Sequence, residues 1–499
     1  MNSQSMTTDP NYYIACDLGA ESGRVMLACL QDGRLSLEEI HRFPSAVVRV
    51  LGSLRWDVLR VHEELKVGLR KIAKRSVPAL GISVDSWGVD YVLVNAVHPM
   101  LSPPFHYRDD RTATTYERVR ESVGSKLIFE ETGIQFMPIN TIYHLASDVE
   151  KSRAILDAAD CFLTVGDYFN YLFSGVACVD ESLASTTQLY NPRTRSWSER
   201  LIERCGIPRK IFPKVVRPGT VLGPLLPEVC AETGLNDVQV IATCSHDTGE
   251  AVAAVPGNGD DWAYLSSGTW SLIGVELAQP LISETIRTHN FTNEAGYGGT
   301  TRFLKNIVGL WILQESRRVW EKQGIELDYA SLTDAANQAE AFRSLINPNA
   351  ARFAKSGDMP AHIEAYCNET GQPAPQSAGQ FARCILESLA LSYRTALDEI
   401  EELTGRSIAR LHIVGGGSQS ALLNQFAANA TRREVIAGPV EATAAGNVLI
   451  QAIALGQVES LEALRKIVSD SFPLRAFKPL DTTNWEDAYG RFTQLKIAT

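Results

Sequence analysis

Residues 12–33 read "YYIACDLGAESGRVMLACLQDG", an apolar run, a turn of small and polar residues, and a second apolar run. Two such runs on either side of a glycine-containing turn predict a β-hairpin. Gly19 and Gly23 let the backbone of the turn approach a ligand closely. The stretch therefore predicts an antiparallel strand pair as the first ordered element, with a candidate ligand-binding turn between its strands.

Further apolar runs rich in β-forming residues follow, and helical patterns separate them. The strand-like runs are "ALGISVD" at 79–85, "YVLVNA" at 91–96 and "VQVIAT" at 238–243, and "VLRVHEELKVGLRKIAK" at 58–74 has helical periodicity. Strands that alternate with helices indicate an α/β fold.

The second half of the chain repeats this order. The run "AYLSSGTWSLIGVE" at 263–276 again reads as strand, turn and strand, and "RLHIVGGGSQS" at 410–420 precedes a helical run at 421–430. At 499 residues the chain exceeds the size at which one hydrophobic core stops growing. The cluster "PGNGDDW" at 256–262 is typical of a domain boundary. We therefore expect a duplicated α/β architecture with a central cleft, in domains 11–256 and 257–499.

One long helix is expected at 379–405, where apolar residues keep helical spacing before "TG" ends the run. This stripe is more typical of a protein core than of a cofactor site. Its members are Phe381, Ile385, Leu389, Tyr393, Leu397 and Ile400.

The charge and composition favour a cytoplasmic protein that binds small molecules. A formal net charge of −11 opposes general attraction to nucleic acid or to anionic membranes. No apolar run approaches the length of a membrane span, and the first residues lack an apolar signal core. The sequence leaves the choice between a monomer and a homodimer open.

The cysteines and histidines do not form a recognisable metal motif. The nine cysteines include no CxxC and the nine histidines no HExxH, so neither structural zinc nor zinc hydrolase chemistry is indicated. Cys367 and Cys384 bracket a loop that would allow their sulfurs to meet. A disulfide there is not favoured, because cytosolic proteins rarely retain one.

Three glycine-containing turns could together hold a nucleotide. In "DLGAESGR" at 17–24, Ser22 offers a hydroxyl and Arg24 offers a positively charged guanidinium with paired donors. Asp17 offers a carboxylate that could anchor hydrated Mg²⁺. This segment is not a P-loop, because G-x-x-x-x-G-K-[ST] is absent, and alone it reads equally as an ordinary hairpin turn.

The other two turns lie in the second half of the chain. The turn "SSGTW" at 266–270 offers hydroxyl and amide donors, and "VGGGSQS" at 414–420 lets a flat adenine or ribose lie against the backbone. A dinucleotide site is disfavoured because G-x-G-x-x-G is not matched. The three turns in this order favour a phosphotransferase that binds ATP.

A candidate catalytic group follows the strand-like run at 237–243. The next residues, "CSHDTGE" at 244–250, lead into a run of small residues that predicts a helix. Ligands of open α/β sheets bind at strand carboxyl ends, which makes Asp247 a candidate for catalysis. The alternative is that Ser245 or Asp247 merely caps the helix.

Eight segments together resemble the FGGY family of carbohydrate kinases over nearly the whole chain. They are "CDLGAESGRVML", "DSWGVDYVL", "YRDDRT", "TGIQFMPINTIYHL", "SHDT", "AYLSSGTWSL", "LKNIVGLWILQ" and "VIAGPVEATAAGN". The resemblance implies an actin-like, ribonuclease-H-like fold duplicated in a sugar-binding N-terminal and a nucleotide-binding C-terminal domain. It also implies transfer of a phosphoryl group from ATP, with Mg²⁺, to a sugar hydroxyl.

The same resemblance assigns roles to individual residues. Asp247 would be the general base, and the sugar would be bound by Gly88, His246, Asp247, Thr248 and Asn306. The nucleotide would be bound by Ala20, Glu21, Ser22, Gly23, Arg24, Thr269, Gln314 and Gly416, with the metal at Asp17. Glu21 departs from the family pattern, in which a small residue is commoner, and adds a negative charge near the expected phosphates.

Two alternatives remain open from the sequence. The first is a kinase of the same family with another sugar or polyol as acceptor. The second is a non-catalytic, actin-like sensor of sugar or nucleotide. The presence of Asp17, Asp247 and the 266–270 turn in one chain argues against the sensor.

Overall fold

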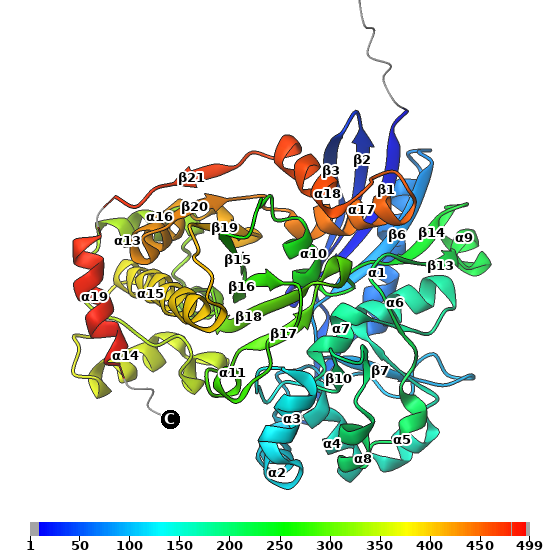
Figure 1. The fold of residues 1–499 in the computed structure, drawn as a ribbon, viewed down its shortest axis with the longest axis horizontal. Coiled ribbons are helices and arrows are strands. Elements are labelled where there is room, and N and C mark those ends of the chain that lie inside the picture. Colours follow the sequence, from blue (N-terminus) through cyan, green and yellow to red (C-terminus); the bar gives the residue numbers. More distant parts are fainter. Residues whose placement is uncertain (1–8, 481, 496–499) are drawn as a thin grey trace, which may run out of the picture. The chain divides into compact units, whose positions relative to one another are not determined.

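The computed structural model describes residues 9–480 and 482–495, which form two compact units (Figure 1). The first unit contains the described residues up to Ala254, then Glu276–Phe303 and Ala442–Ser471. The second contains Val255–Val275, Leu304–Glu441 and the described residues from Phe472 onward. The units are not contiguous in sequence and so do not coincide with a single division at residue 256. Their assignment to sugar and nucleotide remains a prediction.

A six-stranded mixed sheet forms the centre of the first unit, in the order β13-β14-β6-β1-β2-β3. The hairpin predicted at 12–33 is confirmed, because β1 and β2 pair antiparallel with Asp17 opposite Arg24. Strands β1, β6 and β14 are parallel neighbours, so their carboxyl ends lie at the same edge of the sheet. The strands are β1 Asn11–Leu18, β2 Ser22–Gln31, β3 Arg34–Pro44, β6 Ala79–Ser86, β13 Thr220–Pro224 and β14 Gln239–Ala242.

Helices pack against this sheet. The predicted helix at 58–74 is α1 Val58–Ala73, and Asp57 caps it by accepting a hydrogen bond from the Arg60 amide at 3.2 Å. Gly68 lets α1 approach β2 closely, because a Cβ there would lie 2.6 Å from Val25. Helix α17, Ala442–Ala454, returns from late in the chain to pack on β1 and β6.

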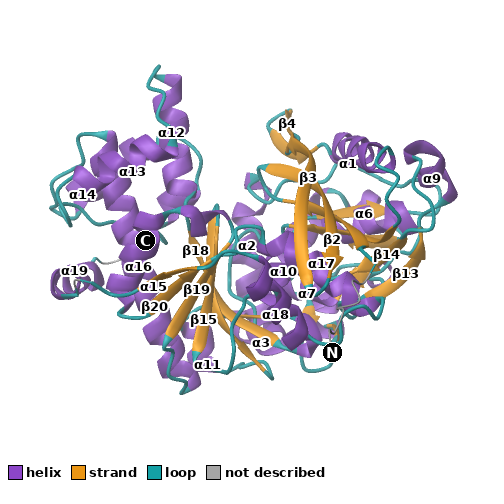
Figure 2. Ribbon diagram, turned by 90° about the horizontal axis from the view of Figure 1, so that it is seen from above, coloured by secondary structure: helices purple, strands orange, loops and turns teal. Residues whose placement is uncertain are grey.

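The second sheet has the order β17-β18-β16-β15-β19-β20-β21. Its strands are β15 Trp262–Ser267, β16 Trp270–Leu277, β17 Thr292–Ala295, β18 Thr301–Val308, β19 Arg410–Val414, β20 Glu434–Ala437 and β21 Arg475–Phe477. The hairpin β15–β16 and the parallel strands β19 and β20 repeat the arrangement of β1–β2 with β6 and β14. The predicted duplicated α/β architecture is therefore confirmed, and Figure 2 shows the strands of each sheet with helices against them.

The long helix predicted at 379–405 is also confirmed as α15, Ala378–Thr404. All six residues of its apolar stripe are buried, and Gly405 ends it in the left-handed conformation at φ 70°. The 410–420 strand and turn lead into α16, Ala421–Thr431, as expected. The second unit further contains α12 Trp311–Lys322, α13 Tyr329–Gln338, α14 Met359–Glu369 and α19 Thr483–Thr493.

The rest of the first unit is made mostly of short elements. The strand expected at 91–96 exists as β7 Tyr91–Val94, but it pairs with β8 in a separate two-stranded sheet. The other elements are β4 Val47–Val50, β5 Ser53–Trp56, α2 Ala113–Val119, α3 Ser125–Thr132, α4 Thr141–Lys151, α5 Arg153–Ala158, β8 Cys161–Thr164, α6 Val165–Ser174, β9 Val179–Asp180, α7 Glu181–Thr186, β10 Tyr190–Asn191, β11 Ser196–Trp197, α8 Glu199–Arg204, β12 Val215–Val216, α9 Pro227–Thr233, α10 Asp247–Ala253, α11 Glu284–Thr288 and α18 Leu461–Ser471.

Two features complete the description. Cys367 and Cys384 are free thiols, and both are buried. Across residues 9–480 and 482–495, no helix combines the length and the apolar character needed to cross a membrane.

Candidate functional site

Three carboxylates lie where parallel strands of the first sheet end. Asp17 near the end of β1 is in register with Asp85 near the end of β6. The segment after β14 continues beside β6, since the Ser86 amide donates to the Ser245 carbonyl at 2.9 Å. This pairing puts Asp247 next to the end of β6, at the edge of the sheet where open α/β folds bind ligands.

One oxygen of Asp247 is held by the protein and the other is not. Its Oδ1 accepts hydrogen bonds from the Thr248 amide at 2.6 Å and from Thr248 Oγ1 at 3.1 Å. Among the described residues no donor is recorded for Oδ2, and the side chain is 32% exposed. A ligand can therefore reach the carboxylate, which keeps one oxygen available as a proton acceptor.

The alternative that Ser245 or Asp247 caps the following helix does not hold. The N-cap of α10 is His246, whose side chain makes no capping hydrogen bond, and Asp247 is the first helical residue. The carboxylate of Asp247 therefore stands in the first turn of α10 without serving as its N-cap.

The charge of the neighbouring carboxylates changes the acidity of this group. Burial, followed by the negative charge of Asp17, raises the pKa of Asp247 to about 7. Burial and Asp17 also raise the pKa of Asp85 well above its usual value, although Asn447 donates a hydrogen bond to Asp85 Oδ2 at 2.8 Å. A carboxylate with a pKa near 7 is suited to general-base catalysis.

The sequence reasoning missed two buried acids beside this group. Asp85 and Glu250 are both 0% exposed, and burial raises the pKa of Glu250 well above its usual value. Asp85 carried a signal that could have found it, because it stands near the carboxyl end of a predicted strand. Glu250 carried none, since an acid within a helical run is normally solvated.

The turn between β1 and β2 is closed by its own backbone and by Ser45. The Gly19 amide donates to the Ser22 carbonyl at 3.0 Å, while Ser45 Oγ donates to the Gly19 carbonyl at 2.8 Å and the Ser45 amide to the Glu21 carbonyl at 2.9 Å. The guanidinium of Arg24 forms an ion pair with Asp17 across the hairpin. The predicted phosphate-binding residues Ala20 to Arg24 therefore span the turn and the first residues of β2, where Arg24 is already paired with Asp17.

The carboxylates at this edge of the sheet suit the coordination of hydrated Mg²⁺. Mg²⁺ keeps several waters and is usually held by one or two carboxylates together with substrate phosphates. Asp17 and Asp85 supply two carboxylates at adjacent strand ends, and Asp85 Oδ1 is buried without a hydrogen-bond partner. Among the residues that the structure describes, no cluster of three or more His, Cys, Asp or Glu side chains could hold a metal by itself.

The loop that contains Gly88 is strained and tightly held. Val89 has φ 71°, an unusual conformation for a β-branched residue, and its amide donates to Thr186 Oγ1 at 3.2 Å. Its carbonyl accepts from Thr141 Oγ1 at 2.6 Å. A Cβ on Gly88 would lie 3.0 Å from Thr186 Oγ1, so no larger residue fits without displacement. Strain of this kind is concentrated at functional sites.

Trp87 is fixed by a buried acid. Its Nε1 donates to Asp90 Oδ2 at 2.9 Å, and Trp56 Nε1 donates to the same oxygen at 2.6 Å. The two indoles pack with their centroids 4.1 Å apart. Trp87 is 8% exposed, which leaves a small part of its surface for a ligand.

In the second unit, the 266–270 turn and the 415–419 turn lie against each other. A Cβ on Gly417 would overlap Ser267 Oγ, and one on Gly415 would lie 3.1 Å from the Ser267 carbonyl. Nothing lies within 4 Å of a Cβ on Gly416. The outer glycines, Gly415 and Gly417, thus allow close packing, whereas Gly416 faces open space.

The remaining predicted residues also lie in the second unit. Thr269 is at the tip of β15–β16, where its carbonyl accepts hydrogen bonds from the Gly309 amide at 3.1 Å and the Trp311 amide at 3.2 Å. Gln314 lies on α12, and its Oε1 is buried without a hydrogen-bond partner. Asn306 lies on β18, so of the predicted sugar residues it alone belongs to this unit.

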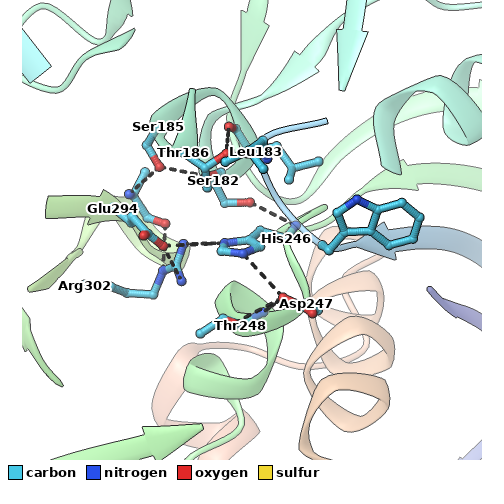
Figure 3. Close-up of polar contacts among 12 residues, drawn as sticks. Ser182, Leu183, Ser185, Thr186, His246, Asp247, Thr248, Glu294 and Arg302 are labelled. Carbon is cyan, nitrogen blue, oxygen red and sulfur yellow. Dashed lines mark hydrogen bonds and ion pairs between the residues drawn. The ribbon is translucent and has the colours of Figure 1, made fainter. Parts of the chain in front are cut away.

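Two charged residues that the sequence reasoning missed surround His246 (Figure 3). Arg302 Nη2 lies 3.0 Å from His246 Nδ1, and Arg302 Nη1 lies 3.2 Å from Glu294 Oε2. His246 Nε2 lies 3.4 Å from Asp247 Oδ1. All four residues belong to the first unit.

Comparisons with known proteins agree over nearly the whole chain. Residues 12–254 match the N-terminal domain of the FGGY family of carbohydrate kinases, and residues 263–455 match its C-terminal domain. The rhamnulokinase of Bacteroides thetaiotaomicron is 42% identical over 480 residues, which cover 96% of this chain and 98% of that protein. The rhamnulokinase of Enterococcus faecalis is 41% identical over 476 residues, which cover 94% and 95%.

Solved structures show the same fold at lower identity. A ligand-bound xylulose kinase from Lactobacillus acidophilus matches with a TM-score of 0.81 at 15% identity, over 97% of this chain and 98% of that one. The glycerol kinase of Plasmodium falciparum with ADP matches with a TM-score of 0.78 at 13% identity, over 98% and 99%.

Proposed function

Because the chain belongs to the FGGY family of carbohydrate kinases, we propose that it is a rhamnulokinase. It would transfer the γ-phosphoryl group of ATP to the 1-hydroxyl of L-rhamnulose, a step in L-rhamnose degradation. Rhamnulokinases from several bacteria, at 39–42% identity over at least 94% of this chain, support the choice of sugar.

One observation at the site carries the proposal of catalysis. Asp247 is reachable, its Oδ1 is held by Thr248, and its Oδ2 is left for a proton. Oδ2 would take the proton of the sugar hydroxyl while the sugar oxygen bonds to the γ-phosphorus. The bond between that phosphorus and the β–γ bridging oxygen breaks, and its electron pair leaves with ADP.

We assign nucleotide binding to the three glycine-containing turns and to α12. Ala20 to Arg24 would contact phosphate, Thr269 would lie near the γ-phosphate, and Gln314 and Gly416 would contact the nucleoside. The unpaired Oε1 of Gln314 and the open space beside Gly416 support these roles. Asp17 would hold hydrated Mg²⁺, which supplies charge neutralisation at the phosphates.

The sugar would contact Gly88, His246, Thr248 and Asn306. L-Rhamnulose is a 6-deoxyketose, so its methyl group needs an apolar surface while its hydroxyls need donors and acceptors. Trp87 suits the methyl group, because Asp90 fixes its indole next to Gly88. Tyr91 suits the methyl group less, because the Tyr91 hydroxyl donates a hydrogen bond to Asp148.

A sugar panel tests this proposal. Purified protein with MgATP and each sugar in turn, with coupled detection of ADP, should give the highest kcat/KM for L-rhamnulose. L-Fuculose and L-xylulose should be weaker acceptors, and glycerol should be nearly inert. A tenfold preference for D-xylulose or glycerol would overturn the choice of sugar but not of reaction. Absence of sugar-dependent ADP release with every sugar would favour the non-catalytic sensor.

A further inference from the structure

Arg302 is a charged side chain with no access to solvent. It lies on β18, is 0% exposed, and is among the largest fully buried side chains of the described residues. Its Nε donates to the Ala295 carbonyl at 3.0 Å, and its Nη1 forms the ion pair with Glu294. A buried ion pair adds little stability compared with apolar residues of similar volume. Its presence beside a catalytic group therefore needs a reason other than stability.

The third contact of Arg302 determines where His246 carries its proton. Arginine only donates hydrogen bonds, so Nδ1 of His246, at 3.0 Å from Nη2, must be the acceptor. The neutral ring then carries its hydrogen on Nε2. Glu294 Oε2 would favour the opposite tautomer, but it is farther from Nδ1, at 3.6 Å, and is engaged by Arg302.

The ring nitrogen that carries this hydrogen, Nε2, lies near the carboxylate of the proposed general base. Nε2 lies 3.4 Å from Asp247 Oδ1, the oxygen that Thr248 already holds (Figure 3). Burial, followed by the charge of Arg302, also lowers the pKa of His246 well below its usual value, so the ring remains neutral. The donors recorded for Asp247 among the described residues both belong to Thr248 and both reach Oδ1, and His246 Nε2 lies on the same side, so Oδ2 keeps its lone pairs for the substrate.

We propose that Arg302, anchored by Glu294, is a positioning residue for phosphoryl transfer, because it locks His246 in the tautomer whose Nε2–H orients Asp247. This inference rests on the proposed kinase function. Arg302 touches neither the substrate nor the reacting atoms, and it acts through the imidazole.

The direct test is the tautomer of His246 in the full-length protein. Histidine labelled with ¹⁵N distinguishes a protonated ring nitrogen from an unprotonated one, and loss of a signal in His246→Asn identifies the residue. We expect Nδ1 to be unprotonated in the wild type, and Arg302→Met to populate the other tautomer. A wild-type ring protonated on Nδ1, or an unchanged tautomer in Arg302→Met, overturns the proposal.

Kinetics of the same variants separate positioning from folding. Arg302→Met should lower kcat about 10–100-fold, the range for partners that orient an active group, with less than about threefold change in the KM of the sugar. Rates are divided by the folded fraction, which is measured as the stoichiometry of nucleotide binding in calorimetry. Arg302→Lys keeps a hydrogen-bond donor and Glu294→Gln weakens the anchor of Arg302, so each should lower kcat less than Arg302→Met does. These two variants provide the test if Arg302→Met does not fold.

Arg383 provides a matched control in the second unit. It is a partly buried arginine that pairs with Glu387 at 2.7 Å, on the helix α15. Arg383→Met should lower the melting temperature without changing kcat per folded molecule. If Arg302→Met also leaves this kcat unchanged, Arg302 is only structural. A wild type that phosphorylates no sugar refutes the proposed function instead, and the tautomer measurement still decides whether Arg302 sets the proton position on His246.

Discussion

Asp247 combines a high pKa with an accessible oxygen, and both properties come from its immediate neighbours. Burial, followed by the negative charge of Asp17, raises its pKa, while Thr248 fixes one carboxylate oxygen. A carboxylate with a pKa of about 7 is about half ionised at neutral pH, and it is a stronger base than an ordinary carboxylate.

Replacement of Asp247 by asparagine should therefore remove the base and leave the fold intact. Asn keeps the side-chain volume, so the melting temperature and the affinity for ATP should change little. The value of kcat should fall by roughly 10²–10⁴-fold, the usual contribution of a general base. A variant that retains more than about a tenth of the wild-type kcat would show that Asp247 is not the base.

The pH dependence of kcat/KM should follow the ionisation of Asp247. Asp247 must be ionised to accept a proton, and its pKa is raised to about 7, so kcat/KM should fall as the pH drops below about 7 and level off above it. Mg²⁺ at the proposed Asp17 site would offset one cause of the shift, so a higher Mg²⁺ concentration should move the acidic limb to lower pH. His246 does not produce this limb, because its pKa lies well below its usual value. A flat profile of kcat/KM across neutral pH would contradict the assignment.

At the scale of single elements, the 415–419 turn shows how neighbouring glycines serve different purposes. Gly417 makes room for Ser267, whereas Gly416 faces open space. Substitution of Gly416 should affect nucleotide binding, whereas substitution of Gly417 should affect thermal stability.

Gly416→Trp should abolish nucleotide binding and leave the melting temperature nearly unchanged, because the indole fills open space. Gly417→Ala should lower the melting temperature, because its Cβ would lie 2.6 Å from Ser267 Cβ, and overpacking costs about 1–3 kcal/mol. Ser267→Gly should rescue Gly417→Ala. Calorimetry and thermal unfolding measure both effects, and equal destabilisation by the two single substitutions would refute the distinction.

The elements that were predictable from sequence are those with local patterns. The 12–33 hairpin has two apolar runs and a glycine turn within one stretch, and α15 has a continuous buried stripe from Phe381 to Ile400. Strand β7 looked equivalent to the others, but its partner β8 lies about 70 residues away, and no local pattern records such a pairing.

The same limit applies to the site. Asp247 could be singled out from the sequence as a candidate because it follows shortly after a strand-like run. Arg302 was not, because it lies in an ordinary strand and its partner His246 is 56 residues away in sequence. A buried hydrogen bond between segments distant in sequence leaves no periodic or compositional signal.

At the scale of the whole molecule, the first unit is assembled from three separate segments. Helix α17 contributes Asn447 and Gln451, both 0% exposed, which lie beside β1 and β6 near the candidate site. Gln451 Nε2 donates to Asn447 Oδ1 at 2.7 Å and to the Ile14 carbonyl at 2.9 Å, and Asn447 in turn donates to Asp85. Asp85 thus depends on residues that follow it by more than 350 positions.

A fragment that ends at residue 256 should therefore fail to fold cooperatively. It lacks 442–471, so the face of β1 and β6 that α17 covers is exposed and Asp85 loses its hydrogen bond. Circular dichroism should show no sharp thermal transition, and the amides of β1 should exchange rapidly with deuterium, in contrast to the full chain. A sharp transition with protected β1 amides would show that 442–471 is dispensable for folding.

The late position of α17 in the sequence also determines when the first unit can complete its folding during synthesis. The ribosome releases the first strands early, but the segment that completes their unit ends at Ser471, 217 residues after Ala254. At about 5–20 residues per second, the nascent first unit waits roughly 10–40 s with one face of its sheet uncovered. During that interval the uncovered apolar surface is prone to aggregation, and the proposed base acquires its final surroundings only after α17 has been synthesised.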